Sequence, residues 1–538
     1  MRFGLLLTSL IAAASCFAQE PKLILQITVD QLRGDLLHRY EDSFVDGKYP
    51  GFKQFLDRGT LYTNTHYRHA ATLTAVGHAT LATGAIPAHH GLIANNWYDA
   101  TNNKSMYCVA DAETKILHGK GYSASPANLT ASTFSDQLHM ASNGKAKIYS
   151  VSVKDRGAIL TGGHFGKSFW YDKKVGDFVT SSYYYDEMPA WLTEFNTSGL
   201  KDKYVGSNWS MLYEEDKYHN DLANQMFQIP PRGFSRGFPH GLPKQSGPDY
   251  YAALALTPYA DTLTAQLAKK IVSEHALGKD NITDYLAVSF SIADYVGHNY
   301  GPNSRESEDN LYHLDQTLSG LFQFIDEHVG LDNTLIVLSA DHGVDAIPEY
   351  KKSLGFAAFR GDVSKRIEDF AQELQQEYGL DESPLLSAIM PNIYLNHQAL
   401  AQAGVNKSAI EQRLYDFVAA QPELSRVFKK HTLLTQNASD DDIASKVKNN
   451  LMPDRSGDFV VVQKTSAMTG NYASATHGSP YNYDTFVPMY FTGWKVKSRK
   501  VTARTSPEDV AVTLSALLGI GYPDRATGQV LDEIAGLK

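Results

Sequence analysis

Cysteine is scarce in this 538-residue chain, which has only Cys16 and Cys108. If the segment that holds Cys16 is removed on export, Cys108 has no partner, and an intrachain disulfide framework is excluded. A chain of this length can bury a stable core without one. We therefore interpret Cys108 as a packed small apolar residue and not as a nucleophile.

Excess positive charge and long apolar runs are missing as well. The 49 Lys and Arg residues against 59 Asp and Glu give a formal net charge of −10, so the sequence indicates no nucleic-acid-binding surface. Beyond the N-terminus no run reaches the roughly 18 apolar residues that a membrane-spanning helix needs. What remains is an ordinary globular composition, with 43% hydrophobic and 20% charged residues.

The N-terminus has the pattern of a secretory signal peptide over residues 1–18. Arg2 precedes an apolar stretch, and Cys16 and Ala18 are small residues at positions −3 and −1 of a cut before Gln19. We expect an exported protein, periplasmic or secreted. Two alternatives stay open: a buried N-terminal strand or helix, and a lipoprotein acylated at Cys16.

Short runs rich in β-branched residues alternate with helical patterns along the chain. The clearest helix is residues 305–329, where apolar residues recur at three-and-four spacing. The runs that predict strands are Leu23–Val29, Lys147–Val153, Tyr285–Phe290, Thr334–Ser339 and Phe459–Val462. This alternation predicts an α/β fold whose mostly parallel sheet is covered by helices on both faces.

Two segments interrupt the alternation. Residues 160–250 are rich in aromatic residues, glycine and proline, and residues 345–470 contain a helical stretch at 363–379. We expect both to be insertions that form a cap beside the functional site. The chain from residue 19 to residue 538 is then one catalytic domain with two cap insertions.

Six candidate metal ligands occur along the chain in a mixed Asp and His set. They are Asp30, Asp294, His298, Asp341, His342 and His477. Asp30 and Asp341 follow predicted strands, which is where open α/β sheets place ligands. Mixed Asp and His ligands suit zinc, and two clusters suggest two ions. Singly, a strand-end Asp could be a helix cap and the Asp294–His298 pair an ordinary pair on a helix surface. Their joint occurrence favours a metal centre.

Thr74 is the candidate nucleophile, because it stands at the start of a predicted helix. A helix N-terminus offers unpaired N–H groups and a positive dipole end to an anionic phosphoryl group. A metal would activate its hydroxyl, as bound zinc lowers the pKa of water to about 7. The alternatives are that Thr74 is only an N-cap, or that Thr72 is the nucleophile.

The order Asp, Thr, Asp-x-x-x-His, Asp-His, His resembles the alkaline phosphatase superfamily, within it the type I phosphodiesterase/nucleotide pyrophosphatase branch, and more narrowly the PafA-type periplasmic alkaline phosphatases. The segments that carry the resemblance are Thr28–Arg33, Thr74–His78, Asn95–Asp99 and Lys154–Arg156. The likeness runs from about residue 23 to near the C-terminus. It implies an alkaline-phosphatase-like α/β fold with two zinc ions.

The resemblance also implies roles for individual residues. One metal would be held by Asp294, His298 and His477, and the other by Asp30, Asp341, His342 and the Thr74 oxygen. Asn95, in preference to the adjacent Asn96, would contact the non-bridging phosphoryl oxygens together with Lys154 and Arg156.

Lys154 and Arg156 follow the predicted strand Lys147–Val153. Alternation along that strand would put both on one face, with Asp155 opposite. Arginine can bind two phosphoryl oxygens at once, and lysine adds a movable charge. A monoester has a third non-bridging oxygen for this pair, so the pair favours monoesters. The alternative is a solvated, charged strand end.

We therefore predict an exported two-zinc phosphate-monoester hydrolase, an alkaline phosphatase that acts on small phosphate esters through a phosphothreonine at Thr74. A phosphodiesterase or nucleotide pyrophosphatase with the same core is the alternative. A catalytically silent binding protein of this fold is disfavoured, because every core position holds a competent residue. Neither cysteine has the C-x-P-x-R context of a sulfatase, and phosphomutases use serine where this chain has Thr74.

Overall fold

The computed structural model describes residues 20–537 apart from 221, 403–406 and 439. The predicted signal peptide, residues 1–18, and the possible acylation site Cys16 lie outside the described residues. Across the described part of the chain, no helix combines the length and the apolar character that crossing a membrane requires.

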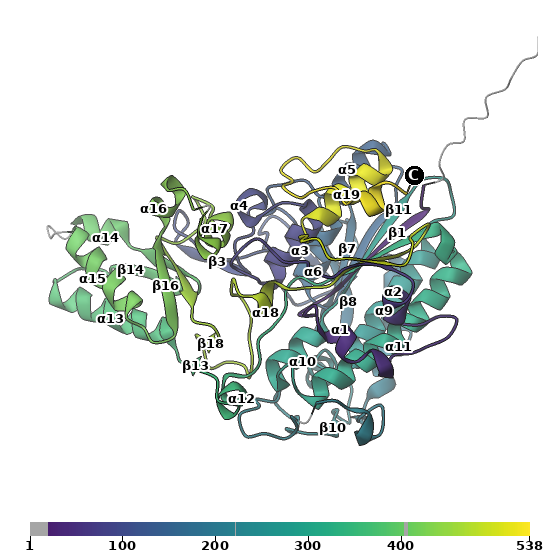
Figure 1. Ribbon diagram of the computed structural model, residues 1–538, viewed down its shortest axis with the longest axis horizontal. Coiled ribbons are helices and arrows are strands. Elements are labelled where there is room, and N and C mark those ends of the chain that lie inside the picture. Colours follow the sequence, from purple (N-terminus) through teal and green to yellow (C-terminus); the bar gives the residue numbers. More distant parts are fainter. Residues whose placement is uncertain (1–19, 221, 403–406, 439, 538) are drawn as a thin grey trace, which may run out of the picture.

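A ten-stranded sheet forms the centre of the molecule (Figure 1). In order across the sheet the strands are β20 (Arg499–Val501), β2 (Thr60–Tyr62), β19 (Met489–Gly493), β12 (Thr334–Ser339), β1 (Leu23–Val29), β11 (Asp284–Phe290), β6 (Ile148–Ser152), β7 (Lys167–Asp172), β8 (Asp177–Ser181) and β5 (Ile116–Leu117). The five neighbours from β12 to β7 run parallel. Strand β19 is antiparallel to both neighbours, and so is β8. The predicted mostly parallel sheet is confirmed.

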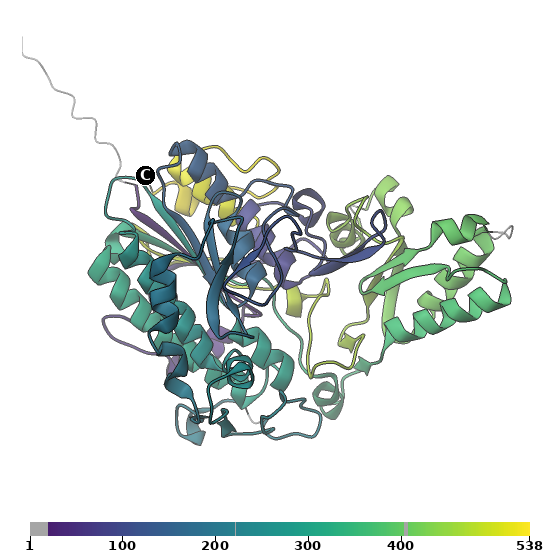
Figure 2. The same cartoon turned by 180° about the vertical axis from the view of Figure 1, so that it is seen from behind.

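Strand β1 shows why the sheet is buried on both faces. All seven residues are buried; Leu25 and Ile27 join one apolar cluster, and Ile24 joins another on the opposite face. The helices that cover the first face include α9 (Pro258–Glu274) and α11 (Arg305–His328), and those on the second include α5 (Phe134–Ala141) and α19 (Asp509–Leu518). Both layers are visible in Figures 1 and 2. Helix α11 confirms the helix expected at 305–329.

Residues 160–250 are placed differently from the expected cap. Strands β7 and β8 lie within the central sheet, so the first part of this segment extends the sheet. Farther along, Trp209, Leu242 and Tyr250 are buried in the same apolar cluster as β1. The segment is therefore part of the main body, and the prediction that it forms a cap is wrong at least for β7 and β8. The high density of aromatic residues had suggested a separate unit, but several of these residues are buried in the core of the main body.

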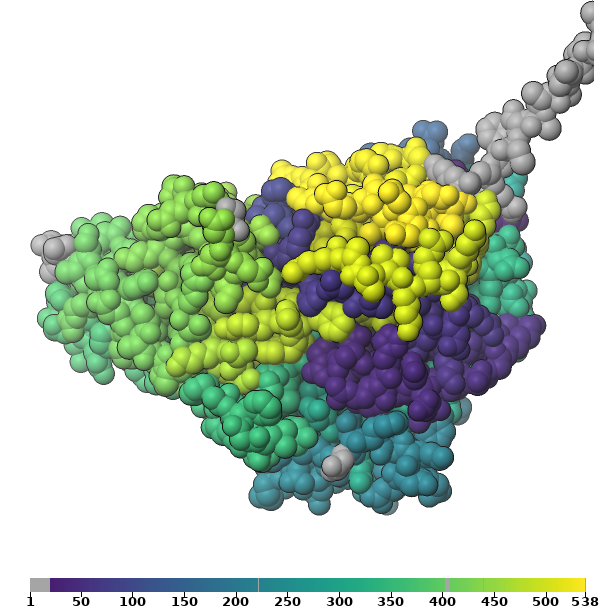
Figure 3. Space-filling model, in the orientation of Figure 1, coloured from purple at the N-terminus to yellow at the C-terminus, as the bar shows by residue number. Residues whose placement is uncertain are grey.

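Residues 345–470 contain a second, antiparallel sheet. Its order is β14 (Leu385–Ile389), β15 (Asn392–Leu395), β17 (Phe459–Gln463) and β16 (Leu424–Lys429). Helices α13 (Val363–Glu377) and α15 (Lys407–Ala419) pack against it in an apolar cluster of their own. The predicted strand Phe459–Val462 thus belongs to this unit and not to the central sheet. In Figures 1 and 3 the unit is a green lobe beside the main body, and we call it the cap lobe.

Cys108 lies in an apolar cluster on the main body and is 1% exposed. Burial raises the pKa of its thiol to about 12. A thiol that stays protonated at neutral pH is a poor nucleophile, which agrees with the packing role expected for it.

Candidate active site

Four adjacent parallel strands bring charged side chains to one edge of the central sheet. Strand β12 leads to Asp341, β1 to Asp30, β11 to Asp294 and β6 to Lys154. Because the carboxyl ends of parallel strands meet at the same edge, residues from distant parts of the sequence lie together. The Lys154 ammonium is 2.6 Å from Asp30 Oδ2 and 2.5 Å from Asp294 Oδ2. All four side chains are buried.

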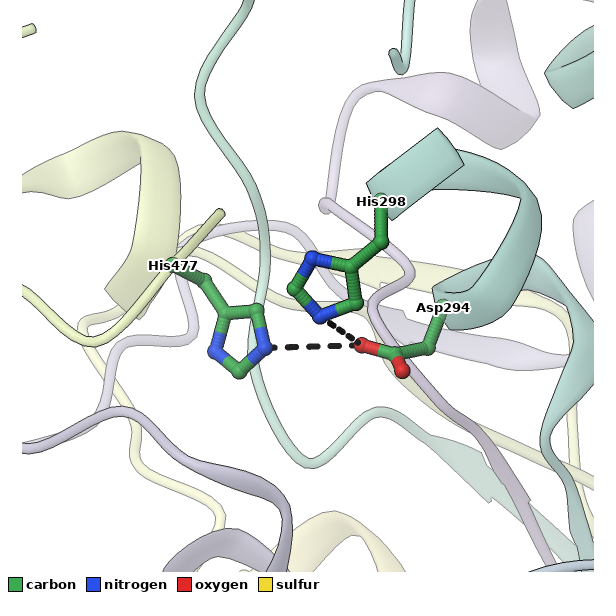
Figure 4. Close-up of side chains that lie close together, drawn as sticks. All are labelled: Asp294, His298 and His477. Carbon is green, nitrogen blue, oxygen red and sulfur yellow. Dashed lines mark ion pairs between the residues drawn. The ribbon is translucent and has the colours of Figure 1, made fainter. Parts of the chain in front are cut away.

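Asp294, His298 and His477 form the first candidate metal group (Figure 4). Asp294 and His298 are one turn apart on α10 (Ile292–Tyr300), and His477 comes from the loop that follows the cap lobe. Asp294 Oδ1 is 3.2 Å from His298 Nε2 and 3.4 Å from His477 Nε2. One ligand atom from each residue lies within 4.8 Å of the others, so the three could hold one cation.

The second candidate metal group is Asp30, Asp294 and His342. Asp294 therefore belongs to both groups, whereas Asp341, which we expected in the second, belongs to neither. Asp341 Oδ2 still lies 3.4 Å from His342 Nε2. A carboxylate shared between the groups would let two cations bind as neighbours, as two-metal sites require.

Hydrogen bonding supports a cation at this position. Three buried ligand atoms have no hydrogen-bond partner among the residues that the structure describes: Asp30 Oδ1, Asp341 Oδ2 and His342 Nε2. Buried polar atoms in folded proteins almost always have a partner. Two carboxylate oxygens and an imidazole nitrogen that converge without hydrogen bonds fit divalent metal ligands.

The three histidines are all oriented in the same way. Each directs Nε2 towards the carboxylates and Nδ1 towards a backbone carbonyl. The carbonyl partners of His298, His342 and His477 are Ala475, Gly343 and Thr72, at 2.8, 3.0 and 2.7 Å. An Nδ1–H donated to a carbonyl leaves the Nε2 lone pair free, which is how metal-ligating histidines are usually held.

The electrostatics of the site favour the neutral form of His342 and His477 but the charged form of His298. Burial lowers the pKa of His342 to about 3, and it also lowers the pKa of His477. Burial opposes a charge on His298 too, but the Asp294 carboxylate outweighs it and raises the His298 pKa. Burial disfavours the Asp294 anion as well, yet His298 and Lys154 hold the pKa of Asp294 well below its usual value. The site therefore stabilises a carboxylate through adjacent positive charge.

Thr74 begins helix α3 (Thr74–Thr83), where the sequence predicted a helix start. It is 1% exposed, and Arg156 Nη2 lies 3.3 Å from its hydroxyl oxygen, to which it donates. The Thr72 hydroxyl instead donates to the Ser479 carbonyl at 2.9 Å. Of the two threonines, Thr74 is the one whose hydroxyl contacts a candidate phosphoryl-binding side chain.

Lys154 and Arg156 are not on an extended strand, so the predicted alternation is wrong. Strand β6 ends at Ser152, and α6 (Asp155–Gly162) begins immediately after Lys154. The two side chains reach the site from a strand-to-helix turn. Sequence reasoning also missed Tyr107, whose hydroxyl donates to Asp155 Oδ1 at 2.6 Å and accepts from Arg156 Nη1 at 3.3 Å.

Asn95 lines the cleft that opens beside the first metal group. Its side-chain oxygen accepts the Ala75 N–H at 2.9 Å, whereas the neighbouring Asn96 is exposed. His298 and His477 line the same cleft, and the cap lobe contributes Met390, Pro391, Val461 and Gln463. Among the described residues that line it, none is Asp, Glu, Lys or Arg. The cap lobe therefore forms an uncharged wall opposite the candidate ligands.

Two polar residues in the recognised segments had been given no role. His78 Nδ1 is 3.3 Å from Asp341 Oδ2, and its Nε2 is 2.8 Å from the Ser289 hydroxyl. Gln31, next to Asp30, bonds to both Asp341 and Asp294. Their only signal in the sequence was proximity to candidate ligands, which says nothing about which atoms they contact.

Gly77 lets helix α3 pass close to the Asp341 backbone. A Cβ atom at this position would lie 2.0 Å from the Asp341 carbonyl oxygen. Glycine inside a helix usually lowers stability, and this close approach explains its presence between Thr74 and His78.

Comparison with known proteins gives matches along nearly the whole chain. The family model described as type I phosphodiesterase / nucleotide pyrophosphatase matches residues 24–485. The chain is 33% identical over 530 residues to alkaline phosphatase PafA of Elizabethkingia meningoseptica, covering 96% of this chain and 95% of that protein. It is 33% identical over 524 residues to alkaline phosphatase PhoV of Synechococcus elongatus, covering 96% of this chain and 93% of that protein. The crystal structure of PafA has a TM-score of 0.89 at 31% identity and covers 96% of this chain and 99% of that one.

We expect Gly77→Ala to lower the free energy of unfolding by about 1–3 kcal/mol, the usual cost of overpacking, and to reduce activity by displacing Asp341. Gly320→Ala on α11 is the matched control, since its nearest neighbour outside the helix would be Lys269 Nζ at 3.5 Å. That change should stabilise the protein by about 0.5–1 kcal/mol. Denaturant unfolding measures both, and a Gly77→Ala protein as stable as the control would contradict the close-approach argument.

Proposed function

Because the chain belongs to the type I phosphodiesterase/nucleotide pyrophosphatase family of the alkaline phosphatase superfamily, we propose that it is an exported alkaline phosphatase, a hydrolase of small phosphate monoesters. One observation carries the proposal: the Thr74 hydroxyl at a helix N-terminus contacts Arg156, and Lys154 joins the two carboxylates Asp30 and Asp294 of the candidate metal groups. A candidate nucleophile, two cationic side chains and candidate metal ligands thus lie in one site.

We propose two zinc ions as cofactors. Asp294, His298 and His477 would hold one ion, and Asp30, Asp341, His342 and the Thr74 oxygen would hold the other. Asp294 lies near enough to contribute to both sites. Bound zinc would supply Lewis acidity and positive charge, which activate a hydroxyl and stabilise a developing oxyanion. The nitrogen and oxygen ligands are those that zinc accepts.

The chain's own residues would carry the chemistry as follows. The Thr74 hydroxyl oxygen would attack phosphorus, the bond from phosphorus to the ester oxygen would break, and that oxygen would leave as the alcohol with a proton that balances the one lost by the hydroxyl. Water then attacks the phosphothreonine, which releases phosphate and restores the Thr74 hydroxyl. Arg156, already in contact with that hydroxyl, would bind non-bridging oxygens with its guanidinium fork. Asn95 accepts the Ala75 N–H through its side-chain oxygen, which leaves its NH₂ group to donate to the phosphoryl group.

Phosphodiester hydrolysis by the same core is the second candidate. The cleft beside the first metal group has an uncharged lining that includes cap-lobe residues, and such a wall could receive the second ester group of a diester. The side chains of Lys154 and Arg156 favour the monoester, because they can compensate the charge of an oxygen that a diester has esterified. The balance between these effects is decided by the substitutions below.

We expect the purified protein to contain about two zinc ions per chain, as a two-metal hydrolase does, and to lose its activity in EDTA. Elemental analysis before and after chelation measures the first, and readdition of zinc should restore hydrolysis. His298→Ala removes one ligand of the first group and should lower the zinc content. Full activity in a preparation with almost no metal would refute the two-zinc proposal.

Thr74→Ala should abolish nearly all turnover, because the hydroxyl that forms the covalent intermediate is gone. Its thermal stability should stay close to that of the unmodified protein, and the zinc ion held by Asp294, His298 and His477 should be retained, because that group is unchanged. Thr72→Ala is the matched control, since that hydroxyl bonds only to the Ser479 carbonyl among the contacts described, and it should retain most activity. The opposite result, with Thr72 essential and Thr74 dispensable, would move the nucleophile by two positions.

Removing Lys154 and Arg156 together should lower kcat/KM for an aryl phosphate monoester by about 10²–10⁴, since bonds to charged groups contribute roughly 1.5–3 kcal/mol each. Hydrolysis of the matching diester should change much less, because less charge develops on its esterified oxygen. Lys154 also pairs with Asp30 and Asp294, so zinc content is measured alongside and Arg156→Ala alone is the cleaner test. Equal losses on both substrates would favour the phosphodiesterase.

A further inference from the structure

Gln31 has an unusual backbone conformation beside the site. It directly follows Asp30 at the end of β1, it is 3% exposed, and its φ is +68°. Residues other than glycine, asparagine and aspartate seldom adopt this left-handed conformation, which costs free energy. A buried glutamine held there is expected only where surrounding contacts require it.

Those contacts connect the two groups of candidate ligands. The Gln31 backbone N–H donates to Asp341 Oδ1 at 3.1 Å, and its side-chain amide donates to Asp294 Oδ1 at 2.9 Å. Asp294 Oδ1 is the same oxygen that faces His298 and His477. Gln31 therefore restrains two carboxylates at once. One is Asp294, which belongs to both candidate metal groups, and the other is Asp341, which lies beside the second group.

The bond to Asp341 leaves its second carboxylate oxygen free, whereas both Asp294 oxygens have a hydrogen-bond partner. On Asp341 the N–H donates to Oδ1, while Oδ2 has no hydrogen-bond partner in the described part of the chain and faces His342 and His78. On Asp294 the amide holds Oδ1 from one side, while Lys154 holds Oδ2 at 2.5 Å. The orientation of both carboxylates is thus set by contacts other than a metal ion.

Gly297 provides the space for the Gln31 side chain. It lies inside α10, between Asp294 and His298, where glycine would normally weaken the helix. A Cβ atom on Gly297 would lie 1.8 Å from Gln31 Oε1. The glycine of the Asp-x-x-Gly-His segment and the glutamine after Asp30 are therefore fitted to each other, although they are far apart in the sequence.

We infer that Gln31 is a positioning residue that sets the relative placement of Asp294 and Asp341, and through them the affinity of the site for its metal ions. The inference rests on the proposed two-metal function. Gln31 would not touch the substrate. Its loss should weaken metal binding and lower kcat more than it changes KM, since the reacting groups lose alignment while the substrate cleft stays intact.

Two substitutions remove the amide contact in different ways. In Gln31→Asn the new residue adopts a left-handed backbone conformation readily and keeps the main-chain N–H, but its side chain is one methylene group shorter, so the amide cannot reach Asp294. Gln31→Met keeps the length and removes the donor. We expect each to weaken zinc binding by about 10–100-fold, as substitutions of groups that orient metal ligands usually do. Zinc affinity is measured by competition with a chromogenic chelator. Gln54→Met is the matched control, because its buried amide donates to Thr492 on β19.

A double-substitution cycle separates positioning from general damage. In the unmodified chain, Gly297→Ala should displace the Gln31 amide and weaken zinc binding. In the Gln31→Asn protein the same change should cause little further loss of zinc affinity, because both substitutions act on one contact. Unfolding of the metal-free proteins is measured in parallel.

Zinc affinity that falls in both Gln31 variants, with the metal-free unfolding temperature close to that of the Gln54→Met control, supports the inference. Unchanged zinc affinity in either variant overturns it, and so does an affinity loss that only parallels a loss of stability. If the unmodified chain itself binds no zinc, the proposed two-metal function is refuted. That result differs from one in which the unmodified chain binds zinc and the Gln31 variants bind it equally well, which refutes only the positioning role of Gln31.

Discussion

Three buried carboxylates, Asp30, Asp294 and Asp341, lie close together at the end of the central sheet, and their repulsion must be offset by positive charge. Burial and the neighbouring Asp341 charge raise the pKa of Asp30 well above its usual value. Removing isolated carboxylates from water is costly unless they are paired. Lys154 supplies one positive charge between two of them. Divalent ions at the two ligand groups would supply the rest, and with it the positive field that a phosphate dianion needs.

The parallel sheet makes this concentration of charge possible. Strands β12, β1, β11 and β6 are direct neighbours, so four chain segments end at one edge. Two large apolar clusters on the faces of the sheet hold those ends in place. A core of this size can offset the unfavourable burial of the polar groups, because each buried Leu, Ile or Val side chain contributes about 1.5–3 kcal/mol. The fold and the site are therefore energetically linked.

The cap lobe adds a different element, since it contributes no ligand. Its own sheet and apolar cluster form a unit beside the main body, and the strands of that sheet and the turn between two of them bring Met390, Pro391, Val461 and Gln463 to the cleft. The charged chemistry lies on the main body, while the wall opposite is uncharged. This separation would let the leaving group vary without changing the phosphoryl site.

The sequence by itself determined the central strands β1 and β12, helix α11 and the candidate ligands, because apolar periodicity is local and Asp30 and Asp341 stand at the ends of apolar runs. It also placed Thr74 at a helix start. Tertiary structure alone decided that β7 and β8 extend the central sheet, since an aromatic-rich composition is equally compatible with a core segment and with an insertion. It alone showed that Asp294 belongs to both ligand groups and that Gln31 joins Asp294 to Asp341. Such contacts join residues hundreds of positions apart, and their geometry exists only after the strands have paired and the helices have packed.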